Sequence, residues 1–106
     1  MMDKLTLVIP AKNESESLPT VLKELEIIKI KTLVVIPVED KTTKESIQNF
    51  NCKIIEEKNG KGYGNALRTG INQVETDFFC IFNADGSFDP KDLNKMYQIL
   101  DKNNAD

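Results

Sequence analysis

Two side chains that could hold a cation or a sugar hydroxyl follow a short apolar stretch of the sequence. Residues 78–82 are all apolar and predict a buried strand, and Asn83 and Asp85 come directly after it. Because side chains alternate along an extended segment, we expect Asn83 and Asp85 to face the same way. Ligands of open α/β sheets bind outside the carboxyl ends of strands, which favours a binding role for this pair. The alternative is an ordinary strand-to-helix turn made of turn-forming residues.

A second stretch combines glycines with basic side chains. Gly60, Gly62 and Gly64 alternate around Lys61, and Arg68 lies in the helix predicted to follow. Glycine permits positive φ angles and leaves backbone N–H groups open to an anion, and a helix N-terminus favours negative charge. This stretch therefore suits a diphosphate. It does not match a P-loop, because the Gly-Lys-Gly is not followed by Lys-Ser/Thr.

The spacing of apolar residues predicts an alternation of strands and helices that would bring these residues together. Strands are predicted over Leu5–Ile9, Thr32–Ile36, Lys53–Glu56 and Asp77–Phe82. Helices are predicted over 18–28, 44–50, 63–74 and 89–100. Such alternation predicts an α/β fold with a doubly wound, mostly parallel sheet of about four strands and helices on both faces. The charges that flank the third strand favour a place near the sheet edge, and Gly70 favours close packing of its helix on the sheet.

The carboxyl ends of parallel strands lie along one edge of a sheet, so the loops that follow the four strands should meet there. Acidic side chains follow the first two strands: Glu14 after one, Glu39 and Asp40 after the other. Carboxylates can accept hydrogen bonds from a nucleobase or from ribose, and an aspartate can bring Mg²⁺ or Mn²⁺ to a diphosphate. The combination fits a metal-bound nucleoside diphosphate. Polar loops are also what any protein surface shows, and that alternative stays open.

Length and composition exclude several other classes of protein. The chain has 106 residues, which predicts a single domain over 1–106, and its net charge of −3 argues against a nucleic-acid-binding surface. The absence of histidine excludes Ser-His and Cys-His nucleophilic machinery. Cys52 and Cys80 lie in apolar runs and are expected to be free thiols. No apolar run approaches the roughly 20 residues that span a bilayer, and no leader is evident, so we expect a cytoplasmic chain.

Four motifs, at residues 8–14, 38–40, 60–70 and 83–90, together resemble the successive motifs of the family 2 glycosyltransferases. These enzymes have the GT-A fold, and the likeness is greatest to the branch that makes dolichol- or polyprenyl-phosphate mannose and glucose. The resemblance implies transfer of a sugar from a nucleoside-diphosphate sugar to an acceptor, with inversion and with Mg²⁺ or Mn²⁺. The acceptor would be a lipid phosphate or a glycan, which in the full-length protein implies a place at the cytoplasmic face of a membrane.

The resemblance also assigns roles to residues at matching positions. The donor-binding residues would be Pro10, Ala11, Glu14, Glu39, Asp40, Gly60, Lys61, Arg68, Asn83 and Asp85. Of these, Glu39 and Asp40 would meet the base and ribose, Lys61 and Arg68 the diphosphate, and Asp85 the metal. The sequence departs from the family pattern at Asn83, which stands where the first aspartate of an Asp-x-Asp motif is usual.

The resemblance implies a longer enzyme, about twice this length, of which the chain is the N-terminal nucleotide-binding part. The general base would then lie beyond residue 106, and the exposed sheet edge would favour self-association. One alternative is a non-catalytic module that binds a nucleotide or a partner, which Asn83 favours. A receiver-like domain is disfavoured, because it expects an aspartate after the third strand, where this chain has Glu56, Glu57 and Lys58.

Overall fold

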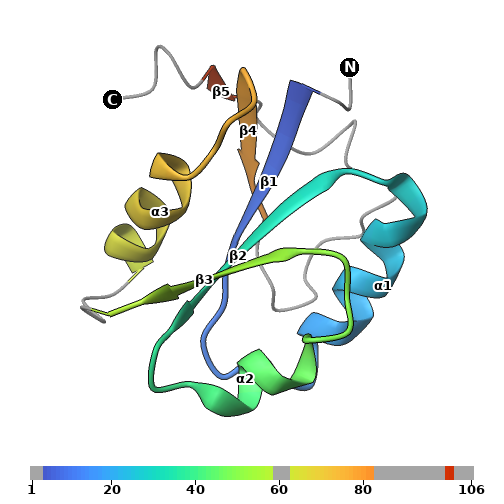
Figure 1. The fold of residues 1–106 in the computed structure, drawn as a ribbon, viewed down its shortest axis with the longest axis vertical. Coiled ribbons are helices and arrows are strands. Elements are labelled where there is room, and N and C mark those ends of the chain that lie inside the picture. Colours follow the sequence, from blue (N-terminus) through green and yellow to red (C-terminus); the bar gives the residue numbers. More distant parts are fainter. Residues whose placement is uncertain (1–3, 59–62, 83–99, 102–106) are drawn as a thin grey trace.

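Strands and helices alternate along the chain in the computed structural model, which describes residues 4–58, 63–82 and 100–101 (Figure 1). The elements are β1 (Leu5–Pro10), α1 (Leu18–Ile28), β2 (Lys31–Pro37), α2 (Lys41–Ser46), β3 (Lys53–Glu57), α3 (Tyr63–Asn72), β4 (Phe78–Ile81) and β5 (Leu100–Asp101). Each of the four predicted strands is confirmed, with ends that differ by no more than one residue.

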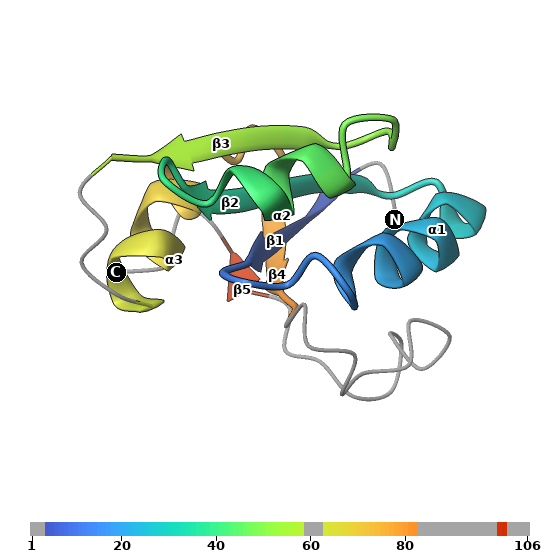
Figure 2. The ribbon, with the colours of Figure 1, turned by 90° about the horizontal axis from the view of Figure 1, so that it is seen from below.

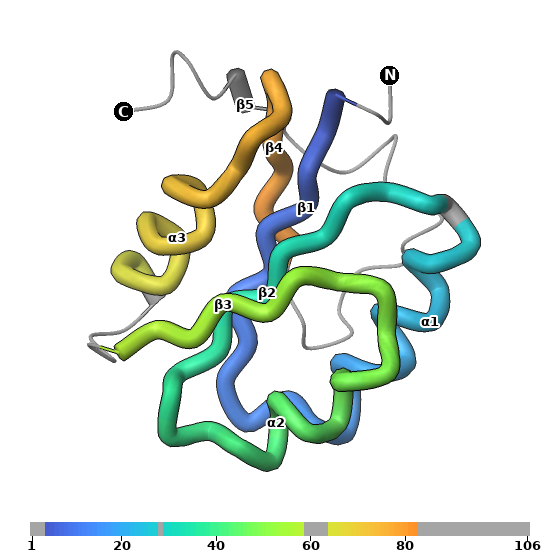
Figure 3. The backbone as a smooth tube through the Cα atoms, in the orientation of Figure 1, coloured from blue at the N-terminus to red at the C-terminus, as the bar shows by residue number. Residues whose placement is uncertain are grey.

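The strands form one sheet in the order β3-β2-β1-β4-β5. The first four are parallel, and β1 lies between β2 and β4, as the backbone trace in Figure 3 shows. The short β5 pairs antiparallel with β4. The edge position predicted for β3 is confirmed. The order differs from the 2-1-3-4-5 order of receiver-like folds and matches that of the Rossmann type, in which ligands bind where the strand order reverses, between β1 and β4.

Helices cover both faces of this sheet, as predicted. Seen from below, α3 lies on one side of the strands and α1 on the other (Figure 2). Alternate residues of the strands serve the two faces: Leu7, Ile9, Val34 and Ile36 pack in the cluster that includes Leu18, Val21, Leu22 and Leu25 of α1 and Ile47. The second cluster contains Val8, Leu33, Val35, Val74 and Phe79, with Ala66 and Ile71 of α3 packed against it. Burial on both faces explains why the central strands are almost continuously apolar.

Gly70 brings α3 close to the sheet. A Cβ atom at this buried position would lie 2.5 Å from Val8 Cγ1 and 2.9 Å from Val35 Cγ2, too close for any side chain. The close packing predicted for Gly70 is therefore present. Glycine weakens a helix, but a larger residue at this position would push α3 away from β1 and β2.

Two predicted elements need correction. The helix predicted over 44–50 is α2, which runs from Lys41 to Ser46, because Asp40 caps it and starts it earlier. Leu100 was predicted as the end of the last helix, but it belongs to β5 and pairs with Phe79. The remainder of that predicted helix, 89–99, lies outside the described residues. Within the described ranges, no helix is long and apolar enough to cross a membrane.

Candidate functional site

The end of β1 is tied to the strands on both of its sides. Beyond the register of the strands, the Ala11 N–H donates a hydrogen bond to the Val35 carbonyl oxygen at 2.9 Å, and the Phe82 N–H donates to the Val8 carbonyl oxygen at 3.0 Å. The segment that follows β1 therefore starts from a fixed position at the reversal of strand order. Among the described residues, 11–14 follow β1 directly at this crevice, where a ligand would bind.

Asp40 connects this segment to the start of α2. Its Oδ2 accepts a hydrogen bond from the Asn13 backbone N–H at 2.6 Å and one from the Thr43 hydroxyl at 2.7 Å. Its Oδ1 accepts from the Thr43 backbone N–H at 3.2 Å, which makes Asp40 the N-cap of α2. One carboxylate thus joins the exit of β1 to the exit of β2.

The surroundings of Asp40 favour its charged form. Burial raises the pKa of the carboxyl, but hydrogen bonds from Asn13 and Thr43 and the positive charge of Lys12 lower it by more. The pKa of Asp40 consequently lies below its ordinary value. Asp40 therefore accepts these hydrogen bonds as a charged carboxylate at neutral pH.

Thr43 completes the connection, and sequence reasoning did not identify it. Its side chain is fully buried, with 0% exposure, and its hydroxyl donates to Asp40 while accepting from the Glu14 backbone N–H at 3.1 Å. The Glu14 carboxylate in turn accepts from the Ser17 hydroxyl at 2.7 Å. The one feature of the sequence that could have identified Thr43 is its place three residues after Asp40, which is the spacing of a helix cap.

A cavity of about 530 Å³ opens at this connection. It is lined by residues 13–17 of the segment after β1 and by Asp40 and Thr43 at the start of α2. Glu14, Asp40 and Ser17 make it a polar cavity with an excess of carboxylates. Such a lining suits a ligand that offers hydroxyl or amine donors, or a cation.

A buried glutamate lies at the exit of β3. Glu57 is 4% exposed, and its Oε1 accepts a hydrogen bond from the Asn65 side-chain amide of α3 at 3.1 Å. The Val38 N–H donates to the Glu57 carbonyl oxygen at 3.0 Å. The exits of β2 and β3 and the first turn of α3 are thus fixed to one another. The sequence predicted acidic residues at this exit but assigned them no role.

The structure brings some of the predicted donor-binding residues together and leaves others apart. Ala11, Glu14 and Asp40 belong to the connection described above, Pro10 is the half-buried last residue of β1, and Glu39 is exposed beside Asp40. Arg68 is exposed on α3, which packs on the face of the sheet opposite to α1. Gly60, Lys61, Asn83 and Asp85 lie outside the described residues. Among the residues that are described, no group of three or more metal-binding side chains occurs.

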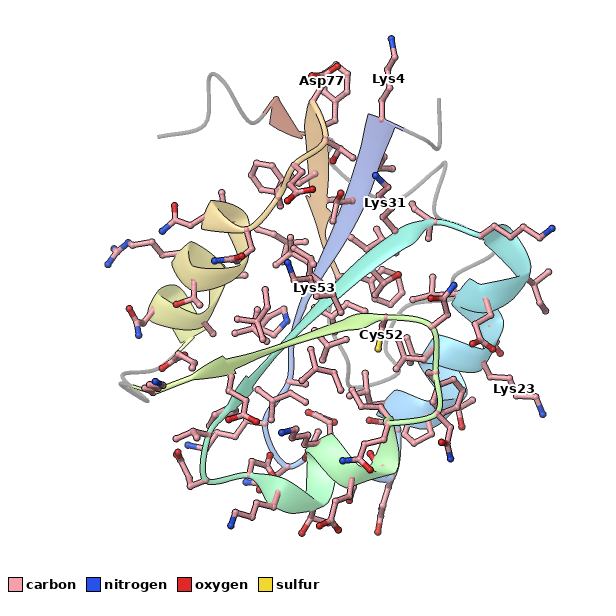
Figure 4. All side chains as sticks on the ribbon, viewed as in Figure 1. Lys4, Lys23, Lys31, Cys52, Lys53 and Asp77 are labelled. Atoms are coloured by element: carbon pink, nitrogen blue, oxygen red, sulfur yellow. The ribbon has the colours of Figure 1, made fainter. Side chains whose placement is uncertain are left out.

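Charged side chains lie at both edges of the sheet. Lys4, Lys31 and Lys53 lie at the amino ends of β1, β2 and β3, and Asp77 precedes β4 (Figure 4). The carboxyl edge carries Glu14, Glu39, Asp40 and the buried Glu57, together with Lys12 near Asp40 and Lys44, which pairs with Glu56. The carboxylates of this edge suit a cation or hydroxyl groups.

Two proteins similar in sequence are named as transferases of sugars. A 34% identical stretch of 100 residues is shared with an uncharacterized glycosyltransferase of Mycobacterium tuberculosis, and it covers 94% of this chain and 45% of that protein. The low-salt glycan biosynthesis hexosyltransferase Agl6 of Haloferax volcanii is 28% identical over 106 residues, 96% of this chain and 26% of its own length. The chain thus spans less than half the length of these relatives.

Solved structures show the same fold. Mannosyl-3-phosphoglycerate synthase from Rubrobacter xylanophilus superposes with a TM-score of 0.75 at 18% identity, over 83% of this chain and 33% of that one. The mannosyltransferase PcManGT from Pyrobaculum calidifontis, in complex with GDP-Man and Mn²⁺, superposes with a TM-score of 0.69 at 19% identity, over 77% of this chain and 27% of that one. Both neighbours are GT-A glycosyltransferases. The sequence profile described as Glycosyl transferase family 2 matches residues 6–106, and the chain therefore belongs to the family 2 glycosyltransferases.

Proposed function

We propose that the chain is the donor-binding part of an inverting glycosyltransferase that uses a nucleoside-diphosphate sugar and a divalent cation, Mg²⁺ or Mn²⁺. The observation that carries the proposal is the connection between residues 13–14 and the start of α2, at the carboxyl ends of the neighbouring strands β1 and β2. Ligands of open α/β sheets bind outside the carboxyl ends of the strands. Membership of the family supplies the reaction class.

In this proposal the carboxyl edge of the sheet contacts the nucleoside. Pro10 and Ala11 would lie next to the nucleoside at the end of β1, where Ala11 is buried and fixed by its hydrogen bond to Val35. Glu39 is exposed and has its carboxylate available to accept hydrogen bonds from ribose hydroxyls or from the base. Glu14 is half-buried and lines the cavity.

The diphosphate and the cation are assigned to the segments after β3 and β4. Gly60, Lys61 and Arg68 would neutralise the diphosphate, and Asp85 with Asn83 would supply oxygen ligands to the metal. The mannosyltransferase neighbour was solved with GDP-Man and Mn²⁺, which supports a divalent cation and a nucleotide sugar as the ligands to test. When bound, the cation would offset charge on the diphosphate as the glycosidic bond breaks.

The acceptor proposed is a polyprenyl phosphate, or a glycan, because the motifs most resemble the dolichol-phosphate branch of the family. A lipid acceptor would place the full-length protein at the cytoplasmic face of a membrane. The general base is proposed to lie outside this chain, and no residue of the chain is assigned that role. Self-association through the sheet edge is also proposed, and sedimentation of the chain at high concentration tests it: a monomer throughout would contradict it.

Calorimetric titration tests the donor site. UDP and GDP are titrated, each with and without Mn²⁺, into the wild-type chain, into Asp85→Ala and into Asp77→Ala. We expect metal-dependent binding of one nucleotide that Asp85→Ala abolishes and Asp77→Ala keeps, because Asp77 lies before β4 at the opposite edge of the sheet.

Two other outcomes would contradict the proposal. Metal-dependent binding that Asp85→Ala keeps would show that the metal is held elsewhere, and equal loss in the Asp77 and Asp85 variants would show a general loss of stability in place of a lost ligand. No binding of either nucleotide by the wild-type chain would favour the alternative, a non-catalytic module that keeps the fold alone.

A further inference from the structure

We infer that Thr43 is a positioning residue of the donor site: its buried hydroxyl holds the segment after β1 in the shape that receives the nucleoside. The inference rests on the proposed function for the identity of the ligand, whereas the hydrogen bonds of Thr43 do not depend on that function. Thr43 is joined to two of the proposed donor-site residues by hydrogen bonds, one to the Asp40 carboxylate and one from the Glu14 backbone N–H. Its effect on binding must therefore pass through these two partners.

The first step of the argument is the backbone of Asn13. Its φ angle is 57°, in the left-handed region that residues other than glycine seldom adopt and that asparagine tolerates best. This turn of the backbone is accompanied by two consecutive N–H groups that reach the start of α2: Asn13 donates to Asp40 and Glu14 donates to Thr43. An unfavourable conformation persists only where neighbouring contacts hold it.

The second step is the completeness of the bonding around Thr43. Its single hydroxyl proton goes to Asp40 Oδ2, and its oxygen accepts from Glu14. The side chain is fully buried, so removing the hydroxyl costs both bonds at a position with little access to water. Loss of the hydroxyl would leave the Glu14 N–H without its acceptor and weaken the support of Asn13 through Asp40.

The third step concerns which groups remain for a ligand. The N–H groups of Asn13 and Glu14 donate hydrogen bonds to Asp40 and Thr43 and are not available to a ligand. A ligand would therefore contact the side chains of this segment and the backbone of the residues that precede Asn13. Lys12 and Asn13 are exposed and border the fixed Ala11. Thr43 thus determines which face of this segment is presented to the nucleoside, without touching it.

The test compares Thr43→Val, which removes the hydroxyl at nearly constant shape, with Thr43→Ser, which keeps it. Thr32→Val is the matched control, since Thr32 is also buried and its hydroxyl donates to the Ile30 carbonyl oxygen at 3.2 Å, at the amino end of β2. Each variant is titrated with GDP and UDP in the presence of Mn²⁺, well below its melting temperature. Hydrogen exchange of the Asn13 and Glu14 amides is followed by NMR in the same samples.

We expect Thr43→Val to weaken nucleotide binding about tenfold or more and to speed exchange at Asn13 and Glu14. Thr43→Ser should restore both, and Thr32→Val should change neither, even if it lowers the melting temperature as much. Binding and exchange in Thr43→Val equal to those of the wild type would overturn the inference while the proposed function stands.

Equal loss of binding in the two valine variants would also overturn it, because a general loss of stability would then explain the effect. If the wild-type chain binds neither nucleotide, the proposed function fails, and the exchange measurement alone tests whether Thr43 positions the segment after β1. In that case, faster exchange in Thr43→Val supports the positioning of the segment, and unchanged exchange refutes it.

Discussion

Gly70 of α3 lies against Val8 of β1 so closely that a Cβ at position 70 would be 2.5 Å from Val8 Cγ1. Val8 is fully buried at the centre of the sheet and cannot move aside without disturbing the cluster that it forms with Leu33, Val35, Val74 and Phe79. The distance between α3 and the sheet is therefore set by the absence of a side chain at one position.

Gly70→Ala should destabilise the chain by about 1–3 kcal/mol, because overpacking outweighs the better helix propensity of alanine. The matched control is Gly64→Ala in the same helix, where a Cβ would meet no atom of the described residues within 4 Å. That control should stabilise the chain by up to about 1 kcal/mol. Urea unfolding of both variants checks the prediction, and a Gly70→Ala chain at least as stable as the wild type would contradict it.

Asp40→Asn should lower stability by about 1 kcal/mol at pH 7, because the amide has one oxygen for the donors that the carboxylate now satisfies. The pKa of Asp40 is depressed in the folded chain, so its contribution is present above the unfolded value of about 3.9 and is lost as the pH falls through the lower folded value. The difference between wild type and variant should therefore be full at pH 6–7 and shrink below about pH 4.

Urea unfolding at several pH values measures this difference. Glu39→Gln is the control, because Glu39 is the exposed neighbouring acid and should leave stability at pH 7 unchanged within about 0.5 kcal/mol. A gap between wild type and Asp40→Asn that stays constant down to pH 3 would show that the charge of Asp40 has no part in the connection.

Thr6 and Thr76 form a buried pair that joins β1 to the segment before β4. Their hydroxyl oxygens are 2.6 Å apart, and Thr76 also donates to the Phe78 carbonyl oxygen at 2.8 Å. Thr76→Val should cost about 1–3 kcal/mol, since it leaves the Thr6 hydroxyl buried without this partner. The double variant with Thr6→Val should recover part of that loss in urea unfolding, and strict additivity of the two single changes would contradict the pairing.

The two thiols should react slowly in the folded chain. Burial raises the pKa of Cys80 to about 11, and burial together with the charge of Glu26 raises the pKa of Cys52. Because the thiolate is the reactive form, a disulfide reagent at pH 8 should label Cys52 slowly and the fully buried Cys80 more slowly still. Both should react quickly in urea. Single Cys→Ala variants assign the two rates, and rapid labelling of Cys80 in the folded chain would count against its burial.

The elements of the fold were predictable because each depends on a local pattern. The apolar runs of β1 and β2 and the apolar stripe of α1 are properties of neighbouring residues, and even the close approach at Gly70 followed from a glycine inside a helix. The apolar pattern starts α2 too late, because its true start depends on the cap that Asp40 forms with Thr43. The apolar spacing around Leu100 predicts a helix, whereas its pairing with Phe79 depends on a distant strand.

The sequence predicts the edge of the sheet at which the site lies, but it does not predict the contacts within the site. Parallel strands had to bring Glu14, Glu39 and Asp40 to one edge of the sheet, and they do. The connection through Thr43 joins residues 29 positions apart, and nothing in the local sequence marks a threonine as buried. Its hydroxyl acquires a role only when two loops have been placed side by side by the sheet.

The place of β1 between β2 and β4 has a consequence for synthesis on the ribosome. Leu5 pairs with Phe78, so one side of this strand finds its partner only after 73 further residues (78 minus 5) have been made. Contacts so distant in sequence form slowly. A nascent chain that ends before β4 would present an apolar strand edge to chaperones or to other chains, and completion of the sheet must wait for the fourth strand to leave the exit tunnel.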